Sequence, residues 1–253
     1  MQQAVEVAYS QYEYLALADA HCHLNLFENP EAAIGDSLKN NVRVMITSGG
    51  SAMDNAAAEA LSDGINIFCV IGIDPEHMEE DARYVDGISG TVRGNKSIIG
   101  IGEIGLDFKN EEYAANAKIQ KSLFQRQIDI AKELGIPIVV HARRAIKEAA
   151  EIVIGSEIER AMFHFFEGDA ETARMLEKKE HVISIPPLES GRRKKVIEAI
   201  GIESIVAETD SPAVGKSPSD VRKAIDYIAR VKGIAFEEAA ERTTENVRGL
   251  FYI

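Results

Sequence analysis

Leu15-Ala-Leu-Ala-Asp-Ala-His21-Cys-His23-Leu24 is an apolar run that ends on two histidines spaced two residues apart. If this run is a β-strand, alternation places His21 and His23 on one face, side by side at the end of the strand. Cys22 then points to the opposite face, so we interpret it as a packing residue. Two neutral imidazoles that converge form half of a transition-metal site. The other ligands must then lie at the ends of other strands.

Further strand-like segments follow along the chain, and most pairs are separated by a helical segment, which is the α/β pattern. Several of these segments are rich in Val and Ile throughout, as expected for parallel strands that are covered on both faces. The clearest helix precedes Gly135, and the last one runs from residue 236 to about 250. The eight predicted strands are 15–24, 42–48, 66–74, 97–107, 136–142, 161–166, 182–186 and 205–209.

Eight strands, seven intervening helices and two helices after the last strand predict a TIM (β/α)₈ barrel, a fold of about 250 residues. A doubly wound open sheet is the alternative, but no Gly-x-Gly-x-x-Gly turn follows the first strand to support a dinucleotide site. No linker or repeat divides the chain, so we predict one domain over residues 15–253 after an N-terminal extension, 1–14. The segment 76–95 has no clear periodicity and is not assigned.

Composition places the chain among ordinary globular proteins, with 253 residues, 45% hydrophobic and 27% charged. The apolar runs are only long enough for strands, and residues 1–14 lack the features of a signal peptide. Cys22 and Cys69 suggest no disulfide framework, so a reducing, cytoplasmic location is expected. The formal net charge of −13 repels nucleic acid at long range. A DNA substrate would therefore need local basic groups or metal ions.

Active sites of such barrels lie at the C-terminal ends of the strands. Four of the six histidines lie at such ends, whereas His77 falls in a loop and His181 at the start of a strand. Histidines scattered at random would not divide in this way. The six candidate metal ligands are His21, His23, Glu103, His141, His164 and Asp210.

Four imidazoles and two carboxylates exceed what one tetrahedral zinc ion requires, so we predict two divalent ions about 3.5–4 Å apart. Glu103, flanked by glycines, is the candidate bridging carboxylate. Asp210 can bind one metal and accept a proton from the attacking water, which makes Asp210 and Glu103 the candidate catalytic residues. Asp107 and Glu208 either support ligand histidines from behind or serve as structural partners, and we favour the first role.

Basic residues near these strand ends suggest phosphate binding. Arg143 follows His141 by two residues and should point to the same side, although a solvated surface arginine is equally expected. Four consecutive cations begin a helix after the seventh strand, where they oppose the helix dipole. Such a run is usually a solvated face, but its position favours contact with substrate phosphate. The candidate substrate-binding residues are Arg143, Arg192, Arg193, Lys194 and Lys195.

These motifs together resemble the TatD-type metal-dependent hydrolases, a deoxyribonuclease family of the amidohydrolase superfamily of barrels. The similar stretches occur in the expected order from residue 19 to 251, and only their combination is specific. They are Asp19-Ala-His21-Cys-His23-Leu, Gly102-Glu103-Ile-Gly-Leu-Asp107, Pro137-Ile-Val-Val-His141-Ala-Arg143, His164-Phe-Phe-Glu-Gly168, Glu208-Thr-Asp210-Ser-Pro212 and Thr244-Glu-Asn246-Val-Arg-Gly-Leu-Phe251.

The resemblance implies that Glu103 bridges two metal ions. One ion would be held by His21, His23, Glu103 and Asp210, and the other by His141, His164 and Glu103. The implied metals are magnesium, manganese or zinc, and the histidines favour zinc or manganese over magnesium.

The chain also departs from the family pattern. Asp74 and Glu76 stand where family members usually have histidines, which points to altered DNA binding or another substrate. Phe165 stands where a cysteine is common, and we expect that change to matter little.

The favoured hypothesis is a cytoplasmic deoxyribonuclease that cleaves phosphodiester bonds with metal-activated water, acting on DNA ends or short single strands. The alternative is a dinuclear amidohydrolase or esterase for a small amide, ester or lactone, because the same metal pair suits that attack. A scaffold that merely retains the barrel is a third hypothesis, opposed by the complete ligand set. No membrane partner is expected.

Overall fold

The computed structural model describes residues 15–78 and 83–253, and the predicted N-terminal extension, 1–14, lies outside the described residues. Eight parallel strands form one sheet in their order along the chain. The strands are β1 (Leu17–Cys22), β2 (Val42–Ser48), β3 (Ile67–Ile71), β4 (Ile98–Asp107), β5 (Ile138–Arg143), β6 (Ala161–Phe163), β7 (Val182–Ile185) and β8 (Ile205–Ala207).

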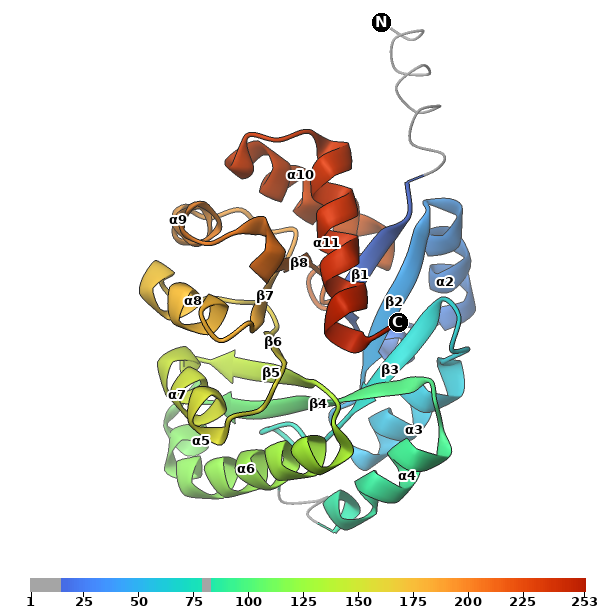
Figure 1. Ribbon diagram of the computed structural model, residues 1–253. Helices are drawn as coiled ribbons and strands as arrows, with labels where there is room; N and C mark the ends of the chain where they lie inside the picture. Colours follow the sequence, from blue (N-terminus) through green and yellow to red (C-terminus); the bar gives the residue numbers. More distant parts are fainter. Residues whose placement is uncertain (1–14, 79–82) are drawn as a thin grey trace, which may run out of the picture.

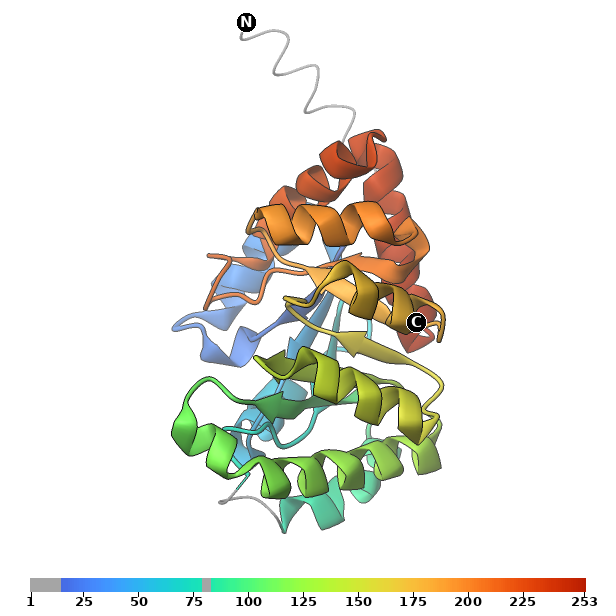
Figure 2. The same cartoon turned by 90° about the vertical axis from the view of Figure 1, so that its left-hand side faces the viewer.

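Helices occupy each connection between successive strands and follow β8. Figures 1 and 2 show them wrapped around the outside of the ring of strands. The α-helices are α2 (Pro30–Lys39), α3 (Ala52–Leu61), α4 (Ile88–Gly94), α5 (Glu111–Ala115), α6 (Ala117–Leu134), α7 (Ile146–Ser156), α8 (Ala170–Glu177), α9 (Gly191–Ala199), α10 (Val221–Lys232) and α11 (Phe236–Phe251). The 3₁₀ helices are η1 (Leu24–Leu26), η2 (Tyr84–Gly87), η3 (Ile202–Ser204) and η4 (Pro218–Asp220).

The first and last strands meet just beyond their C-terminal ends. The backbone N–H of Asp210 donates to the carbonyl of His21 at 2.9 Å, and that of His23 donates to Ser211 at 2.8 Å. These bonds join the two edges of the sheet, so the predicted (β/α)₈ barrel is confirmed.

Apolar side chains fill the barrel. One cluster of buried residues takes members from every strand, with Val44, Val139 and Val206 among them. It also includes Leu250 and Phe251 at the end of α11. Convergence of residues from all eight strands is the pattern of a packed barrel interior. A larger cluster packs the outward faces of the strands against the helices.

The predicted strands agree with the observed ones, with differences at their ends. The second strand has the predicted bounds, 42–48. The first, third, sixth and eighth are shorter than predicted. The segment 76–95 contains η2 and α4, with residues 79–82 outside the described part. Gly135 ends α6 with φ 66°, as predicted for a left-handed cap. No helix of the described residues could cross a membrane, since none combines enough length with enough hydrophobicity.

Candidate metal centre

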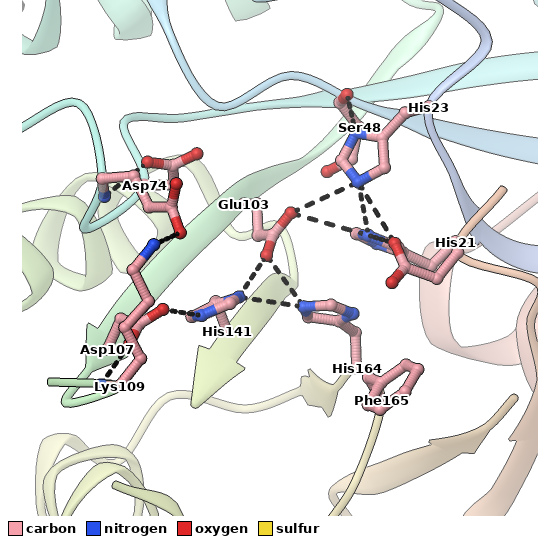
Figure 3. Close-up of polar contacts among 12 residues, drawn as sticks. His21, His23, Ser48, Asp74, Glu103, Asp107, Lys109, His141, His164 and Phe165 are labelled. Carbon is pink, nitrogen blue, oxygen red and sulfur yellow. Dashed lines mark hydrogen bonds and ion pairs between the residues drawn. The ribbon is translucent and has the colours of Figure 1, made fainter. Parts of the chain in front are cut away.

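The six predicted ligands meet at the C-terminal end of the barrel, although they are spread over almost 190 residues of sequence. His21 is the penultimate residue of β1, and His23 follows that strand. Glu103 and His141 lie within β4 and β5, whereas His164 and Asp210 come just after β6 and β8. Figure 3 shows four imidazoles gathered around the carboxylate of Glu103.

Each carboxylate oxygen of Glu103 faces a different pair of histidines. Its Oε1 lies 2.6 Å from His141 Nδ1 and 2.8 Å from His164 Nε2. Its Oε2 lies 3.5 Å from His21 Nε2 and 3.6 Å from His23 Nε2. A carboxylate oriented in this way can bridge two cations, one on each side.

The imidazoles within each pair point their nitrogens at the same space. His21 Nε2 and His23 Nε2 are 3.2 Å apart, and so are His141 Nδ1 and His164 Nε2. Two nitrogens bound to one tetrahedral ion at 2.0–2.1 Å would be separated by about 3.3 Å. Asp210 completes the first pair, with its Oδ1 3.4 Å from His23 Nε2.

Polar groups stand behind three of the rings and form hydrogen bonds with two of them. His23 Nδ1 is 3.0 Å from the carbonyl of Ser48, and His141 Nε2 is 3.2 Å from Asp107 Oδ2. Glu208 stands behind His164, but its Oε2 and the ring Nδ1 are 3.8 Å apart and neither has a hydrogen-bond partner among the described residues. Asp107 and Glu208 therefore lie where predicted, and the placement fixes which ring nitrogens face inward.

Two glycines explain how Glu103 reaches the centre. A Cβ on Gly102 would lie 2.6 Å from Cβ of Val139, inside the barrel. A Cβ on Gly105, whose φ is +148°, would lie 2.0 Å from the carbonyl oxygen of His141. Larger residues would force β4 and β5 apart at the point where Glu103 and His141 face each other.

Electrostatics favour positive charge in this space. Burial would raise the pKa of Glu103, but His164 and His141 outweigh it and hold that pKa well below its usual range. Burial would lower the pKa of His141, but Asp107 and Glu103 raise it to about 9. Burial keeps the pKa of His21 well below its ordinary value, so this ring stays neutral with a free lone pair. A metal cation can supply the positive charge that the carboxylates otherwise draw from protons.

The donor set fits metal ions. In each of three groups, one ligand atom per residue lies within 4.8 Å of the others. Mixed imidazole and carboxylate donors suit zinc and manganese better than calcium. The groups are His21, His23 and Glu103; Glu103, His141 and His164; and His21, His164 and Asp210.

A cavity of about 440 Å³ opens beside the centre, towards β5, β6 and β8. Ligand residues form one wall, and Arg143 lies in another, as predicted. Within residues 15–78 and 83–253, no carboxylate pairs with its guanidinium. The cavity is lined by His141, Ala142, Arg143, His164, Phe165, Glu167, Asp210, Ala213 and Val214.

The structure divides the basic run 192–195 instead of gathering it at the cavity. Arg192 and Arg193 line a smaller hollow of about 260 Å³ between the β6–α8 loop and the start of α9. Lys194 pairs with Glu198 on the exposed side of α9, and Lys195 is exposed. Successive residues of a helix point about 100° apart, so four adjacent cations cannot share one face.

The acids that replace the expected histidines after β3 are paired. Asp74 Oδ1 lies 3.0 Å from Nδ1 of His77, and this bond raises the pKa of His77 to about 9. Glu76 Oε1 lies 2.5 Å from Nζ of Lys109, which follows β4. Negative charge on these two residues is therefore partly offset by local cations.

Sequence reasoning gave no role to Asp19, which is fully buried. Its Oδ1 accepts the backbone N–H of Thr209 at 2.9 Å, and its Oδ2 lies 2.5 Å from the Thr209 hydroxyl. Its Oδ1 also accepts the N–H of His21 at 3.3 Å. Asp19 thus holds β1 to the chain that carries Asp210, and an acid two residues before the first histidine was the available signal.

Comparisons with known proteins point to one family. Residues 18–252 match the family described as TatD related DNase. A metal-dependent hydrolase of Methanocaldococcus jannaschii, itself called uncharacterized, is 32% identical over 92% of this chain and 96% of its own length. A human protein named deoxyribonuclease TATDN3 is 30% identical over 94% of this chain and 95% of its own. The crystal structure of YjjV, a TatD homologue of Escherichia coli K12, superimposes with a TM-score of 0.86 at 20% identity, covering 94% of this chain and 98% of that one.

Proposed function

Because this chain belongs to the TatD-related DNase family and is therefore a metal-dependent hydrolase, we propose that it is a deoxyribonuclease. Its substrate would be a DNA end or a short single strand, and the bond cleaved a phosphodiester. The single observation that carries this proposal is the position of Arg143, which lines the same cavity as the metal donors and has no carboxylate partner among the described residues.

Two divalent ions, zinc, manganese or magnesium, would be held with Glu103 between them. One would sit among His21, His23, Glu103 and Asp210, and the other among His141, His164 and Glu103. Bound ions of this kind supply Lewis acidity and lower the pKa of water to about 7, which provides a nucleophile at neutral pH.

The chain's own residues position the reactants. Asp210 is held by its backbone bond to His21, and its carboxylate faces both His23 and the cavity. It can accept the proton of the attacking water and pass it to the leaving alkoxide, while phosphorus gains the water oxygen and loses the alkoxide oxygen. Arg143 binds a non-bridging phosphate oxygen, since a planar guanidinium matches phosphate geometry. Arg192, which is exposed in the smaller hollow at the start of α9, suits a neighbouring phosphate.

A second candidate is hydrolysis of a small amide, ester or lactone. It is favoured by the acidic residues around the site, with Asp74 and Glu76 after β3 and Glu167 in the cavity wall. The net charge of −13 also disfavours a long polyanion. A small neutral substrate would avoid this repulsion.

The decisive experiment compares substrate classes with the same enzyme preparation. The protein is stripped with a chelator and reloaded with manganese, magnesium or zinc. It is then assayed on single-stranded oligonucleotides, N-acyl amino acids and lactones. We expect metal-dependent cleavage of the oligonucleotide; hydrolysis of only the neutral substrates would replace the deoxyribonuclease by the second candidate.

Arg143→Ala sharpens this test. We expect KM for the oligonucleotide to rise about tenfold, because a charge-assisted contact to phosphate is lost. Arg144→Ala is the matched control: the adjacent guanidinium bonds to the carbonyl of Lys109 and is absent from the cavity lining. Equal KM values for both variants would remove the observation on which the proposal rests.

A further inference from the structure

Phe165 has a backbone that is fixed from two sides. Its φ is +46°, in the left-handed region that non-glycine residues rarely adopt. Its N–H donates to Glu208 Oε1 at 2.7 Å and to Ser184 Oγ at 2.9 Å. Both acceptors are completely buried, so this conformation is set by the barrel rather than by a surface loop.

The fixed backbone places the ring next to the metal centre. Phe165 directly follows His164, and Figure 3 draws it on the far side of His164 from Glu103. The ring is half-buried and lines the cavity that His141 and Asp210 also line. A large apolar face is therefore exposed to whatever occupies the space beside the metals.

Arg193 supports this ring from α9. Its guanidinium carbon lies 5.3 Å from the ring centroid, within the range of a cation–π contact. The side chain is only 6% exposed and donates to the carbonyl of Leu188. Phe165 lines the cavity and Arg193 does not, so the guanidinium contacts the ring from outside this cavity. The aromatic face is thus backed by a buried, immobilised cation.

The rest of the cavity wall suits a ligand that combines a flat ring with an anionic group. Ala142, Ala213 and Val214 add apolar surface, and Arg143 adds a cation. A volume of about 440 Å³ is within the range of small-ligand sites. A nucleotide has both parts, a flat base and a phosphate.

We propose that Phe165, backed by Arg193, is a stacking platform for the nucleobase that adjoins the scissile phosphate. This inference rests on the proposed deoxyribonuclease function and names a specificity-determining residue for it. It also reverses the expectation that phenylalanine at this position matters little, since a smaller side chain would offer no stacking face.

The first test uses two oligonucleotides that differ only in the base next to the cleaved bond, which is present in one and replaced by an abasic analogue in the other. Base–aromatic stacking is worth enough that kcat/KM should favour the intact substrate about tenfold or more. Phe165→Leu should bring this ratio close to one, mainly through KM, and Phe165→Tyr should restore it. Circular dichroism checks that each variant is folded.

The second test does not require catalysis. The chain contains no tryptophan, so Phe165→Trp creates a single fluorescent reporter. We expect thymidine 5′-monophosphate to quench it, and deoxyribose 5-phosphate at equal concentration to leave it almost unchanged. Ile65→Trp is the control, because Ile65 is 74% exposed and precedes β3 at the opposite end of the barrel.

The outcomes separate the two proposals. Equal cleavage of both oligonucleotides by the native enzyme, with no effect of Phe165→Leu, overturns the platform and leaves the deoxyribonuclease standing. Cleavage of neither overturns the deoxyribonuclease. Base-dependent quenching would then still support a ring-binding site at Phe165, whereas equal quenching by both phosphates would exclude it.

Discussion

His164 and His181 stand at opposite ends of the barrel, one just after β6 and the other just before β7, and both are almost fully buried. Burial acts to lower the pKa of both rings. At His164 the charge of Glu103 outweighs burial and raises the pKa well above its ordinary value. At His181 burial prevails, aided by Lys179, and the pKa falls to about 4. The same side chain thus favours positive charge at one end and excludes it at the other, because the buried carboxylates of the described residues lie at the end that holds His164.

Removing the carboxylate of Glu103, which causes this difference in pKa, should have the largest effect on activity. Glu103→Gln keeps the shape but withdraws the charge that faces both pairs of histidines. We expect hydrolytic activity to fall about a thousandfold or more and bound metal to decrease, as measured by turnover and by elemental analysis.

Glu198→Gln is the matched control for a glutamate away from the site, since Glu198 is exposed on α9. Native activity and metal content in Glu103→Gln would show that the contrast between the two ends has no functional meaning.

The carboxylates behind the ligands should matter less. Asp107→Asn and Glu208→Gln leave all six ligands but weaken the orientation of His141 and His164. Losses of about 10- to 100-fold in metal affinity or activity are expected for such supporting groups. Competition with a fluorescent chelator measures the affinity, and wild-type values in both variants would reduce these residues to structural partners.

The opposite end of the barrel should respond to acid. His181 has a folded pKa of about 4, against about 6.5 in an unfolded chain. The unfolded chain therefore binds the proton first as pH falls. The contribution of His181 to stability is complete above about pH 6.5 and is lost as pH falls towards 4, by about 2 kcal/mol at pH 5.

Urea unfolding of the native protein and of His181→Gln, both at pH 7 and pH 5 with chelator present, measures this contribution. The variant should lose about 2 kcal/mol less than the native protein on acidification. Identical losses would mean that His181 is not the group that senses acid at this end.

The smallest effect on activity is expected from replacing a charged residue that is exposed to solvent. Lys194 pairs with Glu198 on an exposed face, and such pairs contribute about 0.5 kcal/mol or less. Lys194→Gln should change kcat/KM for an oligonucleotide less than about twofold. A large loss, measured beside Arg143→Ala, would show that the exposed side of α9 also contacts the substrate.

The pattern of strand ends was sufficient to predict the barrel and the meeting of its six donors. The parallel strands of a closed barrel all have their C-terminal ends on one side. Residues at those ends, such as His21 and Asp210, must therefore lie close to one another, regardless of the paths of the loops. The residue types at these ends, imidazoles and carboxylates, then indicated metal binding. These features depend on periodicity and order, which are visible in one sequence.

Features that depend on register were not predictable. Strand pairing shifts between Asp19 and Cys22, which strict alternation does not show. The contact of Asp19 with Thr209 joins residues 190 apart in sequence. The division of the basic run between a buried Arg193 and an exposed Lys194 required the rotation of α9. The cation–π contact of Arg193 with Phe165 depends on the path of the loop after β6, which has no periodic signal, and on the rotation of α9.

The seam between β1 and β8 has one more consequence. The hydrogen bonds that join the two edges of the sheet involve His21, His23 and Asp210. The barrel therefore closes and the metal ligands come together in the same step of folding. A nascent or truncated chain that stops before β8 would contain five of the six donors yet lack the partner that completes them. Tight retention of metal should therefore require that synthesis and folding have both proceeded past β8.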